Sequence, residues 1–229
     1  MVAIQQKIDF DAISLAAKNS AILAKTFSFD SKCLPTVAEI RREILLEDDW
    51  DLFNANRSSY TFCVRDQYII KNFSILTHEL MLEIKFLVTD KLNLNLVELG
   101  CGLGWFSYWL KKYGVSVLKA VDNKTWNGRD FRWEGILNHV TIEDAVECVV
   151  GFENVDVVFL LSWPYMDDLA HRIWQALKPA QRLLYIGECN GGCTADEVFF
   201  DSVEGHNEVG LENIISFWGI HDRGILYRK

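Results

Sequence analysis

The chain of 229 residues is predicted to fold as an α/β domain built on a doubly wound, mostly parallel sheet. After residue 90, short runs of consecutive apolar residues alternate with segments in which apolar residues recur every three or four positions. Such runs form strands that are buried on both faces, and these strands lie in parallel sheets covered by helices. The expected strands lie at 94–99, 115–121, 155–161 and 182–187, with a weaker one at 138–142. The expected helices between them lie at 105–112, 167–177 and 194–203.

The first ninety residues have a different pattern, and we expect a helical extension at 1–90 in front of a sheet domain at 91–229. Helical spacing of apolar residues runs through 9–27, through a segment with Pro35 in its first turn, and through 73–88. Residues 48–59 are polar and are expected to form a loop, and 60–65 is expected to be a short strand.

The C-terminal part is expected to end in an antiparallel hairpin at the edge of the sheet. Two strand-like pieces lie within 214–229 and are joined at 219–224. His221 and Asp222 then fall in the turn, where polar residues usually face solvent. Upstream, the spacing of Thr194 and Glu197 fits a capping box at the start of a helix.

Charge and cysteine content exclude several classes of function. With 23 Lys and Arg against 32 Asp and Glu, the net charge is −9, which disfavours binding to bulk nucleic acid but allows a short nucleobase-bearing ligand. The six cysteines form no Cys-x-x-Cys pair, so we expect reduced thiols and no metal site, although Cys189 and Cys193 are close in sequence. With no secretory signal and no apolar run of about 18 residues, we expect a soluble cytoplasmic protein that does not span a membrane.

A glycine-rich turn follows the first expected strand of the sheet, where the sequence reads Val-Glu-Leu-Gly-Cys-Gly-Leu-Gly-Trp over 97–105. Alternating glycines let a backbone approach a ligand closely, and the following helix points its amides at that ligand. A dinucleotide fingerprint would need a third glycine at Trp105 or Ser107. The pattern that fits instead is an acid, Glu98, two residues before the first of three alternating glycines.

With this motif the sequence resembles the class I S-adenosylmethionine-dependent methyltransferases over about residues 92–229. The resemblance implies that Glu98 places a carboxylate near the cationic cofactor, directly or through water. It also implies that Asp122 holds the ribose hydroxyls and that Asp144 accepts from the adenine amino group; the alternatives are a turn residue and a helix cap. The cofactor-binding residues expected on this basis are Glu98, Gly100, Cys101, Gly102, Gly104, Trp105, Asp122, Asn123, Asp144 and Ala145.

The fourth expected strand runs into Ser162-Trp163-Pro164-Tyr165, which looks like the (Asp/Asn/Ser)-Pro-Pro-(Tyr/Phe/Trp) signature of amino methyltransferases. By this match Ser162 and the Trp163 carbonyl accept the two N–H groups of the methyl acceptor, and Tyr165 stacks on it. Trp163 stands where the signature has proline, and serine is a weaker acceptor than aspartate. The alternative is a strand-ending turn with a packed tryptophan.

Glu188 ends the fifth expected strand and should therefore face the cleft, as a general base or as an anchor for a substrate amine. Together with the fourth motif, the segments 185–194 and 219–223 resemble a branch of the same superfamily with a Ser-Trp-Pro-Pro-Tyr-like fourth motif. The expected catalytic residues are Ser162, Trp163, Pro164, Tyr165 and Glu188.

Methyl transfer from a sulfonium is an in-line displacement at about 3 Å that depends mainly on positioning. We expect an enzyme of this type, with S-adenosyl-L-methionine as cofactor, acting on a nitrogen of a small molecule or a protein side chain. As in relatives, the N-terminal extension would cover the carboxyl edge of the sheet, with Tyr60 and Phe62 in the pocket, unless it only packs. Trp105 and Trp126 are expected to stack on a ligand.

Two other functions stay open. Gly102 and Gly104 followed by Asp122 are compatible with a dinucleotide-dependent oxidoreductase. The altered fourth motif is compatible with a non-catalytic protein that keeps the Rossmann-like fold to bind a partner.

Overall fold

The computed structural model describes residues 33–45, 65, 68–69, 73–124, 137–153, 156–189, 192–216 and 220–229. The helix expected at 9–27, the loop expected at 48–59, the pocket residues Tyr60 and Phe62, and Trp126 lie outside the described residues. The strand expected at 60–65 is described only at Arg65, whose backbone is helical.

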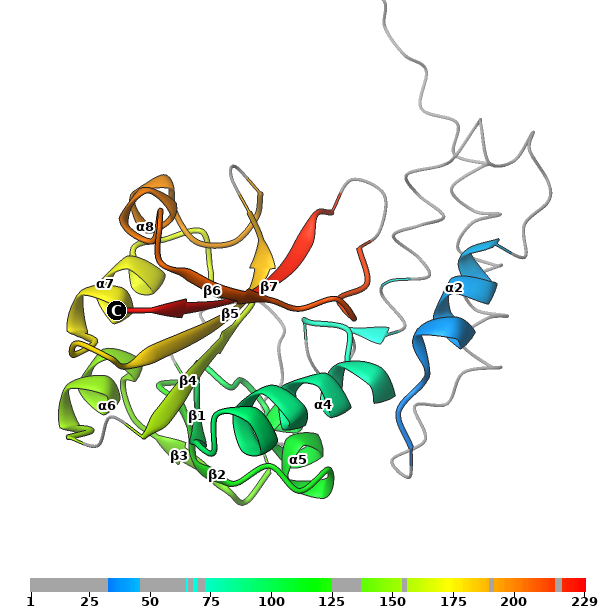
Figure 1. Ribbon diagram of the computed structural model, residues 1–229, viewed down its shortest axis with the longest axis horizontal. Coiled ribbons are helices and arrows are strands. Elements are labelled where there is room, and N and C mark those ends of the chain that lie inside the picture. Colours follow the sequence, from blue (N-terminus) through cyan, green and yellow to red (C-terminus); the bar gives the residue numbers. More distant parts are fainter. Residues whose placement is uncertain are drawn as a thin grey trace, which may run out of the picture.

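The described residues form a seven-stranded sheet in the order β3-β2-β1-β4-β5-β7-β6 (Figure 1). The five strands of its first part run parallel, β7 runs antiparallel to β5, and β6 runs antiparallel to β7. This confirms the prediction of a doubly wound, mostly parallel sheet with a C-terminal antiparallel pair. The strands are β1 Asn95–Leu99, β2 Val117–Asp122, β3 Val140–Ile142, β4 Val157–Ser162, β5 Arg182–Glu188, β6 Asn207–Gly210 and β7 Asp222–Arg228.

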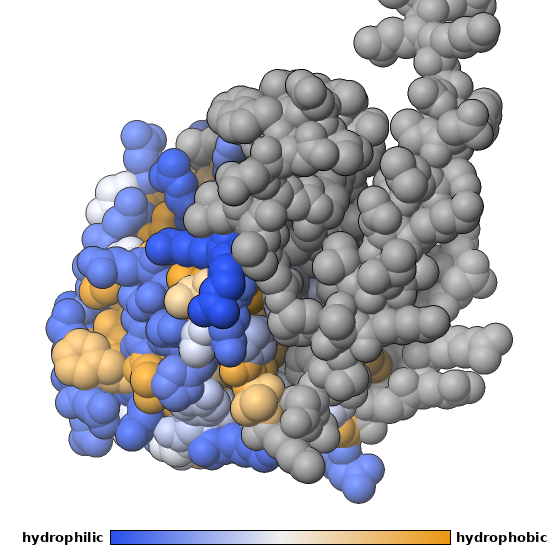
Figure 2. All heavy atoms as spheres, turned by 90° about the vertical axis from the view of Figure 1, so that its right-hand side faces the viewer, coloured by the Kyte–Doolittle hydropathy of each residue, from blue (hydrophilic) through white to orange (hydrophobic). Residues whose placement is uncertain are grey.

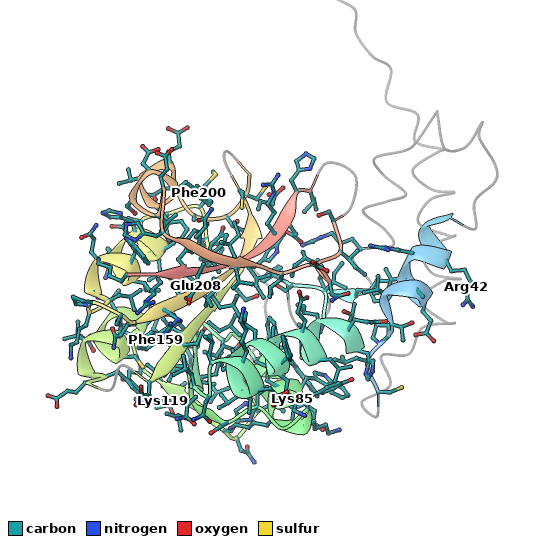
Figure 3. All side chains as sticks on the ribbon, viewed as in Figure 1. Arg42, Lys85, Lys119, Phe159, Phe200 and Glu208 are labelled. Carbon is teal, nitrogen blue, oxygen red and sulfur yellow. The ribbon has the colours of Figure 1, made fainter. Side chains whose placement is uncertain are left out.

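Helices cover both faces of this sheet. Helices α4 and α5 lie on one face, and α6, α7 and α8 lie on the other (Figure 1). Their buried side chains form two hydrophobic cores, one on each face. Consecutive residues of β4 alternate between the two cores: Phe159 points toward α6 and α7 (Figure 3), whereas Val158 and Leu160 belong to the opposite core. The described helices are α2 Val37–Leu45, α4 His78–Lys85, the π-helical η1 Phe86–Lys91, α5 Trp105–Lys112, α6 Ala145–Gly151, α7 Leu169–Ala176 and α8 Glu197–Ser202.

The C-terminal pair differs from the predicted hairpin in two ways. Its first strand lies at 207–210, upstream of the predicted region, and β7 begins at Asp222, which was expected in a surface turn. Asp222 is only 6% exposed. The edge of the sheet is β6, a short strand on which Glu208 pairs with Arg182; short and charged strands are typical of sheet edges.

Helix ends also differ from the predictions, because the capping side chains lie elsewhere. The segment predicted to be helical from residue 73 becomes α4 only at His78, where Thr77 accepts a hydrogen bond from the Leu80 amide at 3.1 Å. Helix α2 begins two residues after Pro35. The predicted capping box is wrong: Asp196 caps α8, whereas the Thr194 hydroxyl donates to the Glu188 carbonyl oxygen. Helix α6 was not predicted.

The described surface that faces the viewer in Figure 2 is mostly hydrophilic, with separate hydrophobic groups between the polar ones. Within the part of the chain that is described, no helix is long and apolar enough to cross a membrane.

Candidate functional site

The site lies where the winding of the sheet changes direction. From β1 the chain moves outward to β2 and β3, and then returns to β4, which pairs with β1 on its other side. The carboxyl ends of β1 and β4 therefore border the crevice in which sheets of this type bind ligands. A cavity of about 390 Å³ lies there, within the size range of small-molecule sites. Its walls are Phe73, Gly100, Asp122, Asn123, Asp144, Ala145, Leu161, Trp163, Pro164, Tyr165, Asp167, Leu169, Arg172 and Cys193.

Many of the residues predicted from the sequence meet at this cavity, although they come from four separate segments. The predicted residues in its walls are Gly100, Asp122, Asn123, Asp144, Ala145, Trp163, Pro164 and Tyr165. The predicted residues outside its walls are Glu98, Cys101, Gly102, Gly104, Trp105, Ser162 and Glu188.

The glycine-rich turn needs its glycines for backbone conformation. Gly100, Gly102 and Gly104 have φ angles of 61°, 55° and 84°, a region that side chains with a Cβ rarely occupy. A Cβ on Gly104 would also come within 2.5 Å of Val140 Cγ2, so this glycine allows α5 to approach β3. Around Gly100 only Leu161 Cδ1 lies within 4.0 Å of an added Cβ, which leaves the cavity side of the turn open.

The amides of this turn are bound within the protein. The Cys101 amide donates to the Val121 carbonyl oxygen, the Gly102 amide donates to Asp122 Oδ2, and the Gly104 amide donates to the Cys101 carbonyl oxygen, each at 2.9 Å. A pyrophosphate-binding turn instead offers its amides to the anion. In this turn the Asp122 carboxylate takes the amide that would otherwise bind the negatively charged pyrophosphate.

Glu98 lies in β1, two residues before Gly100, and is 1% exposed. Its Oε2 accepts a hydrogen bond from the amide of Ser107, the third residue of α5, at 2.9 Å. It therefore satisfies one of the amides that the start of a helix leaves without a partner. Burial, with a smaller contribution from the charge of Asp122, raises the pKa of Glu98 to about 8.

Asp122 and Asp144 occupy the ends of neighbouring strands and both border the cavity. Asp122 is 3% exposed; besides the Gly102 amide it accepts from the Lys124 amide through Oδ1 at 2.9 Å. Asp144 caps α6 through Oδ1, which accepts from the Val146 amide at 2.8 Å. The helix cap was the alternative for Asp144, and the residue combines that role with a place in the cavity wall.

The charge of the cavity is acidic. Among the described wall residues, Asp122, Asp144 and Asp167 carry negative charge and Arg172 carries positive charge. Arg172 also lies 3.6 Å from Asp168, in an exposed ion pair. An acidic cleft attracts cations and repels anions.

Three residues of the fourth motif, Trp163, Pro164 and Tyr165, form part of the cavity wall, whereas Ser162 lies outside it. The Ser162 hydroxyl hydrogen-bonds with the Ser74 hydroxyl at 2.5 Å. Trp163 has a φ of 51° although it is not glycine, and its amide donates to the Ile186 carbonyl oxygen at 2.7 Å. Such backbone strain is concentrated at functional sites. Tyr165 is 54% exposed and lines the cavity.

Glu188 binds two loops. Its Oε2 accepts from the Cys193 amide at 2.5 Å, and its Oε1 accepts from the His221 amide at 3.2 Å. A Cβ on Gly192 would come within 2.3 Å of Glu188 Cβ, so the loop after β5 packs directly against this side chain. The carboxylate thus joins the segment after β5 to the residue before β7, and it lies outside the cavity wall.

Several wall residues were not predicted from the sequence. Phe73 precedes a helix, Asp167 and Arg172 lie at or near the start of α7, and Cys193 lies in a loop. None of these positions has a local pattern that distinguishes it from an ordinary surface or loop residue. Their place in the site follows from the packing of distant segments.

No protein-family model and no curated protein matches the chain. Solved structures with a similar fold include the N-methyltransferase NodS from Bradyrhizobium japonicum, with 12% identity, coverage of 66% of this chain and 94% of that chain, and a TM-score of 0.41. The 1,6-didemethyltoxoflavin-N1-methyltransferase of Burkholderia thailandensis has 14% identity, coverage of 89% and 98%, and a TM-score of 0.40. A variant of MtNAS in complex with S-adenosylmethionine has 12% identity, coverage of 98% and 99%, and a TM-score of 0.47. These are similarities of fold between distant sequences.

Proposed function

We propose that the chain is an S-adenosylmethionine-dependent methyltransferase that acts on a nitrogen of a small molecule or a protein side chain. The observation that carries this proposal is the buried carboxylate of Asp122, which borders the cavity and takes up the Gly102 amide of the glycine-rich turn. S-adenosylmethionine carries a sulfonium, an ammonium and a carboxylate, and its net positive charge suits a cavity with three aspartates and one arginine.

The cofactor would be held by residues at the ends of β1, β2 and β3. Asp122 would accept the ribose hydroxyls, because each carboxylate oxygen has a lone pair beyond the one used by a backbone amide. Asp144 would accept from the adenine amino group through Oδ2, since Oδ1 caps α6. Gly100 would let the cofactor pass close to the backbone, because the space beside its Cα is open.

When bound, S-adenosylmethionine supplies an activated methyl group, and the protein's own contribution is to position the acceptor. The Tyr165 ring would stack on a planar acceptor, and Trp163 and Pro164 would form the wall beside it. The Trp163 carbonyl and the second lone pair of the Ser162 hydroxyl would accept the acceptor's N–H groups. The nitrogen gains the methyl group and loses a proton to solvent.

The charge and hydrogen bonding of the turn favour this proposal over a dinucleotide-dependent oxidoreductase. Three of the turn's amides, those of Cys101, Gly102 and Gly104, already have partners in the protein, and the partner of Gly102 is an acid. These three amides would therefore not be available as donors to a pyrophosphate, and the pyrophosphate would lie near the negative charge of Asp122.

Calorimetric titration of the purified chain with S-adenosylmethionine, S-adenosylhomocysteine and NADH tests the proposal. We expect the two adenosyl ligands to bind with dissociation constants in the micromolar range, which corresponds to a binding free energy of about −8 kcal/mol. We expect NADH not to bind. Binding of NADH alone would support the oxidoreductase. Absence of binding by all three would support a non-catalytic, partner-binding protein.

A further inference from the structure

A second acidic residue lies beside Glu188 at the same edge of the sheet. Asp222, the first residue of β7, pairs in register with Glu188, the last residue of β5. Their side chains are buried, with residue exposures of 6% and 3%. Glu188 accepts hydrogen bonds from the Cys193 and His221 amides, and Asp222 takes no part in either bond. The Asp222 carboxyl therefore does not share the role of Glu188.

The Asp222 carboxyl lies near the indole N–H of Trp163, close enough for the indole to lower its pKa, but the two groups do not form a hydrogen bond in the structure. Trp163 Nε1 and Asp222 Oδ1 are both buried, and neither atom has a hydrogen-bond partner in the part of the chain that the structure describes. Because a buried donor and a buried acceptor without partners are costly, a small rotation of the ring that closes this bond is favourable.

The other sides of the Trp163 ring are also held. The guanidinium carbon of Arg65 lies 4.4 Å from the ring centroid. The ring of Phe73 stacks at a centroid distance of 6.2 Å and an interplanar angle of 20°. The backbone of Trp163 is strained at a φ of 51°, and such a conformation persists only where the surroundings fix it. Trp163 and Phe73 both line the cavity, so the contacts that orient the indole also shape the cavity wall.

We propose that Asp222 is a positioning residue whose carboxylate holds the indole of Trp163 in the orientation that forms the cavity wall. The proposal rests on the proposed function in that Trp163 borders the methyl acceptor there. Asp222 then controls the shape of the acceptor end of the cavity, and cofactor binding at Asp122 and Asp144 does not depend on it.

The charge state of Asp222 is set by its buried neighbours. Burial is the main cause that raises its pKa to about 7; Glu188 raises it further, whereas Arg65 and the Trp163 indole lower it. Tyr185 and Cys189, on β5 and directly after it, also lie near this carboxyl. An ionised carboxylate accepts the indole N–H more strongly than a protonated carboxyl does. The interaction between Asp222 and the Trp163 indole therefore becomes stronger as pH rises through about 7.

Tryptophan fluorescence tests this proposal without any substrate. The chain has eight tryptophans, so the Trp163 component is obtained as the difference between the wild type and Trp163→Phe. We expect this component to change with pH, with a midpoint near the Asp222 pKa of about 7. In Asp222→Asn, which keeps an acceptor oxygen but does not ionise, that transition should disappear. A transition that persists in Asp222→Asn, or a Trp163 component that is constant from about pH 5 to pH 9, would overturn the proposal.

Acrylamide quenching of the same component separates positioning from general packing. Asp222→Ala should increase the quenching of Trp163. In Asp222→Asn, quenching should equal that of the wild type at pH 6, where the wild-type carboxyl is mostly protonated. Equal quenching in Asp222→Ala and the wild type would contradict the proposal. If Asp222→Ala does not fold, the pH transition in Asp222→Asn decides alone.

Titration of Asp222→Asn with S-adenosylhomocysteine distinguishes this proposal from the proposed function. Unchanged affinity together with a lost fluorescence transition is the expected result. Failure of the wild type to bind S-adenosylhomocysteine would contradict the proposed function, while the fluorescence measurements would still decide the role of Asp222.

Discussion

The carboxylate of Asp122 accepts a hydrogen bond from the amide of Gly102 at 2.9 Å, which joins the end of β2 to the glycine-rich turn after β1. Through its other oxygen the same carboxylate binds the Lys124 amide. Asp122 thus fixes the two segments that border the cavity at the carboxyl ends of these strands. Replacing it affects both the conformation of the turn and the charge that a ligand meets.

Gly104→Ala should destabilise the fold more than Gly205→Ala. Both glycines have positive φ angles, 84° and 78°, so each substitution has a backbone cost of about 1–2 kcal/mol. Only the Cβ at position 104 meets another side chain, at 2.5 Å from Val140 Cγ2, whereas nothing lies within 4 Å at position 205. Chemical denaturation of the two variants measures the difference. Equal free energies of unfolding would show that the approach of α5 to β3 is not tight.

Glu98→Gln should change how stability depends on pH. The pKa of Glu98 rises from 4.5 to about 8 in the fold, mainly through burial. The folded state therefore favours the protonated form, and the wild type loses stability as pH rises from about 4.5 through about 8. Glutamine keeps the acceptor for the Ser107 amide and removes the ionisation.

The melting temperatures of wild type and Glu98→Gln should hence converge near pH 4 and diverge by pH 9, where the variant is the more stable. Asp222, the other carboxylic acid with a raised pKa among the described residues, is present in both proteins and cancels in this difference. Glu204→Gln, at an exposed position, is the control and should leave the pH dependence unchanged. A constant difference between wild type and Glu98→Gln across this range would argue against a buried, protonated Glu98.

Glu188→Gln should weaken the loop after β5 without loss of cofactor affinity. The carboxylate accepts the Cys193 and His221 amides, and hydrogen bonds to a charged group are worth about 1.5–3 kcal/mol each. A glutamine amide keeps one acceptor and opposes the second N–H with its own NH₂. We expect faster amide hydrogen exchange at Cys193 and His221 and an unchanged dissociation constant for S-adenosylhomocysteine. A large loss of affinity would instead place Glu188 in contact with the cofactor.

The strands of the parallel sheet could be predicted because burial on both faces leaves a continuous apolar run in the sequence, as in β4. The places of Asp122 and Asp144 followed from this, since parallel strands bring their carboxyl ends to one edge. Helix α5 has the predicted bounds because its start follows the glycine-rich turn directly.

The rest of the site depends on contacts between distant segments. Asp222 was assigned to a turn because Gly219 and Gly224 flank it, whereas its burial depends on the register of β7 against Glu188. Arg65 contacts the Trp163 ring although the two residues are almost a hundred positions apart in the sequence, and no local sequence pattern predicts this contact. The hydrogen bond from the Ser107 amide to the Glu98 carboxylate likewise depends on the packing of α5 against the end of β1, which the glycine-rich motif alone does not predict.

Calorimetric titration of three proteins with S-adenosylhomocysteine tests whether Asp122 lies in an adenosyl-ligand site. Asp122→Ala should lose about tenfold to a hundredfold in affinity, as expected for charge-assisted hydrogen bonds. Asp201→Ala, on α8 and outside the cavity wall, should bind like the wild type. Circular dichroism checks that both variants fold. Wild-type affinity in a folded Asp122→Ala would show that Asp122 does not contact the adenosyl ligand.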